Sequence, residues 1–167
     1  NSEVRGAPVI VEDTPSYKNL FGTIERVVDP HGRVVTNFSR IKAGSLLRAS
    51  GGYILLDIED ALTEPLVWKT LKRTLQSNHI QIDTYDPFAF LTVSALQPEP
   101  IPIQTKVVVM GHPSLYYLLY FNDSDFGRIF KVRADFVEEM DNTATHQASY
   151  AHFIAGLCRQ EGLRHFD

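Results

Sequence analysis

The sequence has 167 residues, of which 44% are hydrophobic and 22% charged, and its formal net charge is −4 at pH 7. This composition is typical of one globular domain, and the lack of any block of like charge argues against a nucleic-acid or polyanion surface. No apolar run approaches the roughly 20 residues that cross a bilayer. The single cysteine, Cys158, fits a buried packing thiol in a reducing compartment. We therefore expect a cytoplasmic protein, without excluding a membrane anchor elsewhere in a longer chain.

Hydrophobic periodicity and turn-forming residues predict alternating strands and helices. In the first third we expect, in order, a short strand at 7–11, one helical turn at 17–21, a hairpin formed by 23–28 and 33–36, and a brief helix at 42–49. After the strand at 53–56 we expect a helix at 64–76, a second hairpin formed by 79–83 and 88–96, and an extended linker at 97–102. In the last third we expect a strand at 107–110, a helix at 114–121, a short helix ending near 130, a strand at 132–137 and a closing helix at 142–161. This order indicates a mostly parallel α/β sheet with flanking helices and two β-hairpin insertions.

Two of the predicted helices are amphipathic. On the helix at 64–76 the buried face is expected to hold Val67, Leu71 and Leu75, and the solvated side to hold Lys69, Lys72 and Arg73. On the closing helix the buried side is expected to hold Tyr150, Phe153, Ile154 and Leu157. Trp68 is expected in the core or in a subunit contact.

The central feature of the sequence is the run Tyr53-Ile54-Leu55-Leu56, which suits a strand buried inside a parallel sheet. The run ends in Asp57, and Glu59 and Asp60 follow, so carboxylates lie at the edge where open α/β sheets hold ligands. An apolar strand that ends in aspartate has the form of a Walker B element, whose carboxylate holds the Mg²⁺ of a bound nucleotide. Taken alone, the strand favours a simpler interpretation, in which Asp57 caps the next helix.

Several strings, in this order along the chain, extend the interpretation. They are GAPVIVEDTPSYKNLFGTIE, TNFSRIKAGSLLRASGGYILLD, QPEPIPIQTKVVVMG and LYYLL. Together they resemble the ATPase module of Lon-type proteases, in the LonB-like branch and its bacterial relatives, over nearly the whole chain. The resemblance implies an AAA+ P-loop domain within an ATP-driven serine protease whose hexameric ring unfolds substrates.

The resemblance also implies that parts of such a protein are missing from this chain. No GxxxxGK[ST] motif occurs, so the phosphate-binding loop is expected upstream of Asn1. The protease domain with its Ser-Lys pair is expected downstream of Asp167, and the helical lid is expected to be absent. We therefore interpret residues 1–167 as the central and C-terminal part of the AAA+ large subdomain, inactive by itself.

Site roles follow from the resemblance, one position at a time. Asp57 matches the Walker B aspartate and is expected to bind Mg²⁺ through water, with ATP as the nucleotide. Active AAA+ ATPases carry a glutamate at the next position, where this chain has Ile58. Glu59 or Asp60 could replace that glutamate if the chain turns at the strand end. His112 occupies the sensor 1 position, where a polar side chain holds water near the γ-phosphate.

Contacts between subunits and with substrate follow in the same way. The arginine that acts on the nucleotide of a neighbouring subunit is expected among Arg128, Lys131 and Arg133, with Arg128 favoured. The partners implied are other subunits of the ring and an unfolded polypeptide, which would contact pore loops at Asp29–Val34 and Tyr85–Phe90. Phe88 and Phe90 could equally pack against the sheet.

Two alternatives remain open at this level. Ile58 and His112 both depart from the active pattern, so the same fold could serve as a structural gate of a Lon-like protease that does not hydrolyse ATP. An enhancer-binding transcription activator shares the LFG and GGxLhhD patterns, but its characteristic loop sequence is absent here, and it ranks last.

Overall fold

The computed structural model describes residues 6–25, 27–28, 34–35, 38–82 and 98–164. The chain divides into two compact units, residues 1–131 and residues 132–167, and each is described by itself. Among the described helices, none has the length and apolar character needed to cross a membrane.

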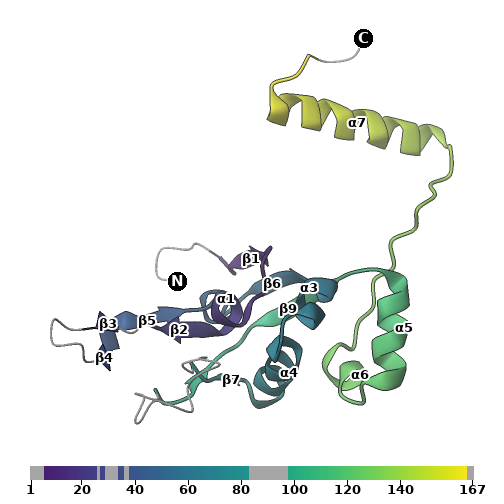
Figure 1. Ribbon diagram of the computed structural model, residues 1–167. Helices are drawn as coiled ribbons and strands as arrows, with labels where there is room; N and C mark the ends of the chain where they lie inside the picture. The colour runs from purple at the N-terminus through teal and green to yellow at the C-terminus, as the bar shows by residue number, and fades with distance from the viewer. Residues whose placement is uncertain (1–5, 26, 29–33, 36–37, 83–97, 165–167) are drawn as a thin grey trace. The chain divides into compact units, whose positions relative to one another are not determined.

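Unit 1 is built on a parallel three-stranded sheet, as the sequence predicts (Figure 1). Its strands are β1 (Val9–Glu12), β6 (Tyr53–Asp57) and β9 (Lys106–Met110), and their order in the sheet is β1-β6-β9. The register pairs Val9 with Tyr53 and Asp57 with Met110. The two continuous apolar runs are therefore neighbours, with β6 in the middle, and the predicted α/β class is confirmed.

One face of this sheet carries the core. Helices α1 (Tyr17–Phe21) and α2 (Ser45–Arg48) lie between β1 and β6 in the chain, and α3 (Ile58–Thr63) and α4 (Val67–Ser77) lie between β6 and β9. Both crossovers step across the sheet in the same direction, so right-handed connections place all four helices on one face. The side chains fully buried there include Leu20, Phe21, Leu46, Ile54, Leu56, Val67 and Leu71.

The opposite face of the sheet is open among the described residues. Side chains that alternate with the buried ones remain exposed there: Val9 at 64%, Val11 at 57%, Tyr53 at 39%, Val108 at 42% and Met110 at 44%. The register aligns them across the three strands. Parallel sheets are normally covered on both faces, so this apolar surface, which we call the open face, is half of an α/β layer arrangement.

The first predicted hairpin is confirmed, and its base is longer than expected. Strands β3 (Val27–Val28) and β4 (Val34–Val35) pair antiparallel, and β2 (Gly22–Ile24) pairs with β5 (Ile41–Ala43) below them. A 3-10 turn, Phe38–Arg40, precedes β5. The helix predicted at 42–49 therefore starts later, because Lys42 and Ala43 belong to the ladder.

The second predicted hairpin needs correction. β7 (His79–Ile80) pairs antiparallel with β8 (Ile101–Pro102), inside the segment predicted to be a linker. Pro102 is tolerated because a two-stranded ladder leaves one edge of each strand without a partner. The expected return strand at 88–96 lies outside the described residues, as do the pore-loop positions 29–33 and 85–90.

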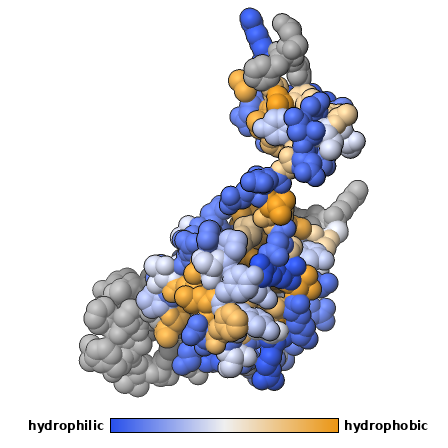
Figure 2. Space-filling model, turned by 90° about the vertical axis from the view of Figure 1, so that its right-hand side faces the viewer, coloured by the Kyte–Doolittle hydropathy of each residue, from blue (hydrophilic) through white to orange (hydrophobic). Residues whose placement is uncertain are grey.

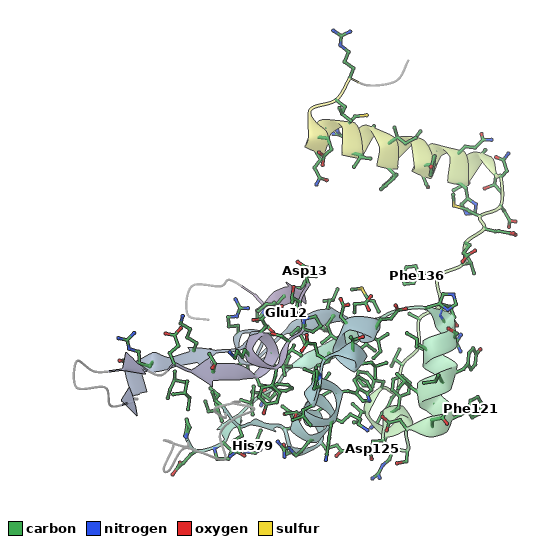
Figure 3. All side chains as sticks on the ribbon, viewed as in Figure 1. Glu12, Asp13, His79, Phe121, Asp125 and Phe136 are labelled. Atoms are coloured by element: carbon green, nitrogen blue, oxygen red, sulfur yellow. The ribbon has the colours of Figure 1, made fainter. Side chains whose placement is uncertain are left out.

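Two helices follow β9, namely α5 (Pro113–Asn122) and α6 (Phe126–Ile129). Helix α5 buries Leu119 but exposes Tyr117, Leu118, Tyr120 and Phe121. Figure 2, viewed from the side on which α5 and α6 lie, shows hydrophobic residues at the surface among hydrophilic ones. Phe121 projects outward from α5 in Figure 3.

Unit 2 contains α7 (Ala144–Glu161), which ends at Gly162 in the left-handed conformation, as expected for a helix stop. Cys158 is buried, which confirms the prediction. Tyr150, Phe153 and Leu157 are exposed within this unit, where α7 is the one helix among the described residues, so unit 2 by itself does not provide their predicted burial.

The strand predicted at 132–137 is also wrong: the structure gives this segment no strand, and Val132 and Phe136 are 89% and 93% exposed. A strand needs a hydrogen-bonded neighbour, and none of the described strands pairs with this segment.

Candidate functional site

The candidate site lies at the carboxyl edge of the sheet. Because the three strands are parallel, their carboxyl ends meet at one edge, which is where open α/β sheets hold ligands. Asp57 ends β6, and Gly111-His112 directly follows β9. The register that pairs Asp57 with Met110 places Asp57 and His112 on neighbouring strand ends. The structure therefore brings these two predicted site residues to the same edge.

Asp57 caps the helix that follows it. Its Oδ1 accepts hydrogen bonds from the backbone N–H of Glu59, at 2.7 Å, and of Asp60, at 3.4 Å. The capping interpretation is thus confirmed, and α3 starts one residue after the strand ends. Oδ2 accepts no hydrogen bond from the residues that the structure describes. One carboxylate oxygen is therefore used for folding, and the other is available to a ligand.

Ile58 is a packing residue. Its side chain is 4% exposed and lies in a hydrophobic cluster with Leu119 and Phe126. A Cβ atom added at Gly111 would lie only 2.3 Å from Ile58 Cγ2, so Ile58 also fills the space beside the end of β9. This position, which follows the Walker B-type aspartate, points into the core.

Glu59 and Asp60 occupy the first turn of α3 and are exposed. Acidic side chains in a first turn are favoured by the partial positive charge of the helix N-terminus. The chain therefore turns into α3 directly after Asp57, and both carboxylates lie within one helical turn of the strand end.

His112 caps α5 with its ring. Nδ1 accepts a hydrogen bond from the backbone N–H of Ser114 at 3.2 Å and lies 2.7 Å from Ser114 Oγ. Since Nδ1 is an acceptor, the proton of the neutral ring resides on Nε2. His112 can therefore offer a hydrogen-bond donor at the carboxyl edge while its other nitrogen holds the helix.

Arg128 lies elsewhere. It belongs to α6 and lines a pocket of about 760 Å³ together with the start of β9, at Thr105, Lys106 and Val107. This pocket is at the opposite end of β9 from His112, so the structure does not bring Arg128 to the Asp57 edge.

The three cationic candidates differ in their partners. Arg133 Nε donates to Asp135 Oδ1 at 2.7 Å. The side chain of Arg128 makes no hydrogen bond or ion pair with any residue described here. Arg128 and Lys131 both line the pocket.

Glu12 and Asp13 were not recognised from the sequence as members of this edge. They end and follow β1, which is parallel to β6, so they lie at the same edge as Asp57 (Figure 3). The sequence does show these two acidic residues directly after the apolar run Val9-Ile10-Val11. It becomes informative only when the neighbour of β1 is known.

Comparisons with known proteins agree with this fold. Residues 5–137 match the family described as "LonB-like, AAA domain". A search of curated proteins found no match. Two solved structures of NtrX from Brucella abortus are similar in fold: one superposes with a TM-score of 0.54 at 16% identity, and the other, in complex with ADP, with a TM-score of 0.58 at 15% identity.

Both NtrX matches cover 95% of this chain but only 33% and 32% of the NtrX chains, so the chain spans about a third of their length. At these identities the similarity concerns the fold alone. The family match covers most of the sequence and the sheet that carries Asp57 and His112. This chain belongs to the LonB-like AAA domain family.

Proposed function

We propose that this chain is part of the ATP-driven unfolding module of a Lon-like serine protease, in which it supplies half of a nucleotide pocket. The observation that carries the proposal is the placement of Asp57 and His112 on adjacent strand ends of a parallel sheet, within a LonB-like AAA domain. An AAA-type domain in such a protease would use ATP hydrolysis to pull polypeptides toward the peptidase. The homologous fold of NtrX has been seen with ADP, which supports nucleotide binding here.

The residues present fit a water-mediated Mg²⁺ site. Among the described residues, no group of three or more metal-binding side chains is clustered, which is compatible with Mg²⁺ because this ion keeps several waters and needs one or two carboxylates. Asp57 Oδ2 is the oxygen that would face such a water. When bound, Mg²⁺ would neutralise phosphate charge, while His112 would donate from Nε2 and Arg128 would act in a neighbouring ring subunit.

The open face supports a missing partner segment. β9 pairs with β6 and with no other described strand, so its second edge can accept another strand. Suppose that a further strand pairs with β9 and that a helix connects this strand to β1. That connection would cross the sheet from the β9 side to the β1 side, opposite to the β1-to-β6 and β6-to-β9 connections. A right-handed connection in that direction would place its helix on the open face. We propose that the phosphate-binding loop belongs to such a unit, upstream of Asn1.

A second candidate function is a structural gate without ATP turnover. Ile58 favours it, because the position that carries the water-polarising glutamate in active relatives is here packed against Leu119 and Phe126. In that case Asp57 serves as a helix cap only, and the ring admits loosely folded substrates.

The experiment that separates the two uses the full-length protein. Degradation of a stably folded substrate and of an unfolded one would be measured with ATP-Mg²⁺, with a non-hydrolysable analogue and without nucleotide. For a motor, the folded substrate disappears only with hydrolysable ATP, and Asp57→Asn abolishes this while Glu99→Gln, at an exposed acid far from the edge, does not. Degradation of the unfolded substrate alone, with no effect of nucleotide, would overturn the proposal and establish the gate.

A further inference from the structure

An ion pair links two helices that are distant in sequence. Lys72 Nζ lies 2.8 Å and 2.7 Å from the two carboxylate oxygens of Asp123. Trp68 Nε1 donates to Asp123 Oδ2 at 2.9 Å, and the backbone N–H of Asp125 donates to Oδ1 at 3.1 Å. Trp68 and Lys72 are one turn apart on α4, so a single helix face holds this carboxylate. We call Trp68, Lys72 and Asp123 the clip.

The clip corrects the expectation that Lys72 is solvated. The Lys72 and Asp123 side chains are only 17% and 14% exposed. A lysine at this depth is stabilised by its partner carboxylate, and removal of either charge leaves the other largely buried without compensation. Sequence periodicity could not reveal this, because Asp123 is 51 residues away.

The clip holds both ends of α6. Asp123 receives the N–H of Asp125, the residue before the helix, and its carbonyl receives the N–H of Phe126 at 3.1 Å. After the helix, the Phe130 ring stacks on Trp68, with centroids 5.8 Å apart and planes 9° from parallel. Helix α6 has four residues, which is too short to be stable by itself. Its orientation therefore depends on its neighbours, namely these contacts with α4 and the packing of Phe126 against Ile58 and Leu119.

Arg128 is carried by α6, and its own side chain has no partner among the described residues. The direction in which it leaves the domain is therefore set by the backbone of α6, which the clip holds together with the packing of Phe126. A guanidinium that acts in trans must be placed to within a fraction of an ångström, since misplacement by about 1 Å can cost roughly 100-fold in rate.

We propose that Asp123 is a positioning residue that, gripped by Lys72 and Trp68, orients α6 so that Arg128 reaches the phosphate of a nucleotide bound in an adjacent subunit. This inference rests on the proposed function and adds a residue that positions Arg128. Asp123 touches no substrate; it acts through Arg128.

The test is a double-mutant cycle in the full-length protein, with kcat and KM for ATP measured for the wild type, Asp123→Asn, Arg128→Ala and the double variant. Asp123→Asn is expected to lower kcat about 100-fold with KM unchanged. In the Arg128→Ala background it should have no further effect on kcat. A role limited to stability would instead lower kcat to the same extent in both backgrounds. Lys72→Arg, which keeps the charge, should retain most activity, and Lys42→Met, which breaks the exposed pair with Glu25, serves as the matched control.

The outcomes separate the two proposals. If the wild type hydrolyses ATP and Arg128→Ala impairs it but Asp123→Asn does not, the positioning role is overturned and the proposed function stands. Additive losses in the cycle also overturn it. If the wild type does not hydrolyse ATP, or Arg128→Ala has no effect, the proposed use of this site fails, and the positioning role fails with it.

Discussion

Asp57 Oδ1 accepts a hydrogen bond of 2.7 Å from the backbone N–H of Glu59, so the residue that ends β6 also begins α3. Folding uses Oδ1, and the proposed Mg²⁺ site would use Oδ2, so the two roles would depend on different oxygens of one carboxylate. Asp57→Ala would remove the helix cap and any metal contact together, so its effects on folding and on ligand binding would not be separable.

Asparagine separates them. Asn caps helices about as well as Asp, whereas Ala costs about 1 kcal/mol of stability. We expect Asp57→Ala to lower the free energy of unfolding by that amount in urea titrations of the 167-residue chain, and Asp57→Asn to leave it nearly unchanged. Both should weaken Mg²⁺-dependent ATP binding in the full-length protein. Equal stability losses in the two variants would show that the cap does not work as described.

Ile58→Glu should destabilise the domain. Ile58 is 4% exposed among Leu119 and Phe126, so a glutamate there would be buried without a partner, at a cost of roughly 3 kcal/mol or more. Glu59→Gln is the control, because Glu59 is exposed and surface changes usually stay within about 0.5 kcal/mol. Urea titration compares the two, and a wild-type midpoint for Ile58→Glu would contradict the packing described.

Gly111→Ala should be destabilising because the new Cβ would meet Ile58 Cγ2 at 2.3 Å, and a β-branched side chain has little freedom to move away. Ile58→Ala alone removes packing and should cost about 2–5 kcal/mol. Combined, the two changes should cost less than their sum, with a coupling of about 1 kcal/mol or more. Strict additivity in urea titrations would show that the two residues do not touch.

The clip should make stability depend on acid pH. Partial burial tends to raise the pKa of Asp123, but hydrogen bonds from Lys72 and Trp68 outweigh it and hold the pKa below its ordinary value. A depressed pKa in the folded state contributes stability above the unfolded value, about 3.9, and this contribution is lost as the pH falls through the folded value.

The measurement compares urea unfolding of the wild type and Asp123→Asn from pH 7 down to pH values below 3.9. The charges that face Asp123 are Lys72 and Asp125, the latter 3.9 Å from the same ammonium. The wild type should lose more stability over this range than the variant. If the free energy of unfolding falls equally with pH in both proteins, Asp123 contributes nothing specific to the loss of stability in acid.

The parts of the fold that could be predicted are those whose structure depends on neighbouring residues in the sequence. β6 and β9 are continuous apolar runs, and such runs indicate central parallel strands without knowledge of any partner. The Asp57 position and the stop of α7 at Gly162 are likewise local, because they depend on residues within one turn. The sequence therefore sufficed to place Asp57 and His112 at one edge.

The parts that failed depend on partners distant in sequence. Residues 132–137 alternate as a strand does, but alternation supplies no neighbour to bond with. Ile101–Pro102 pairs with His79–Ile80 across 83–97, which no local pattern indicates. The burial of Lys72 depends on Asp123. In each case the missing information was which segments meet in space.

The open face has a practical consequence for anyone who handles this chain alone. Aligned Val, Tyr and Met side chains present water with an apolar surface, and such surfaces promote association. The net charge of −4 offers modest repulsion, and it vanishes near the isoelectric point of about 5.8. The polypeptide should therefore bind hydrophobic dyes and salt out readily with ammonium sulfate, and it should be purified well above pH 5.8, at low protein concentration, to remain colloidally stable.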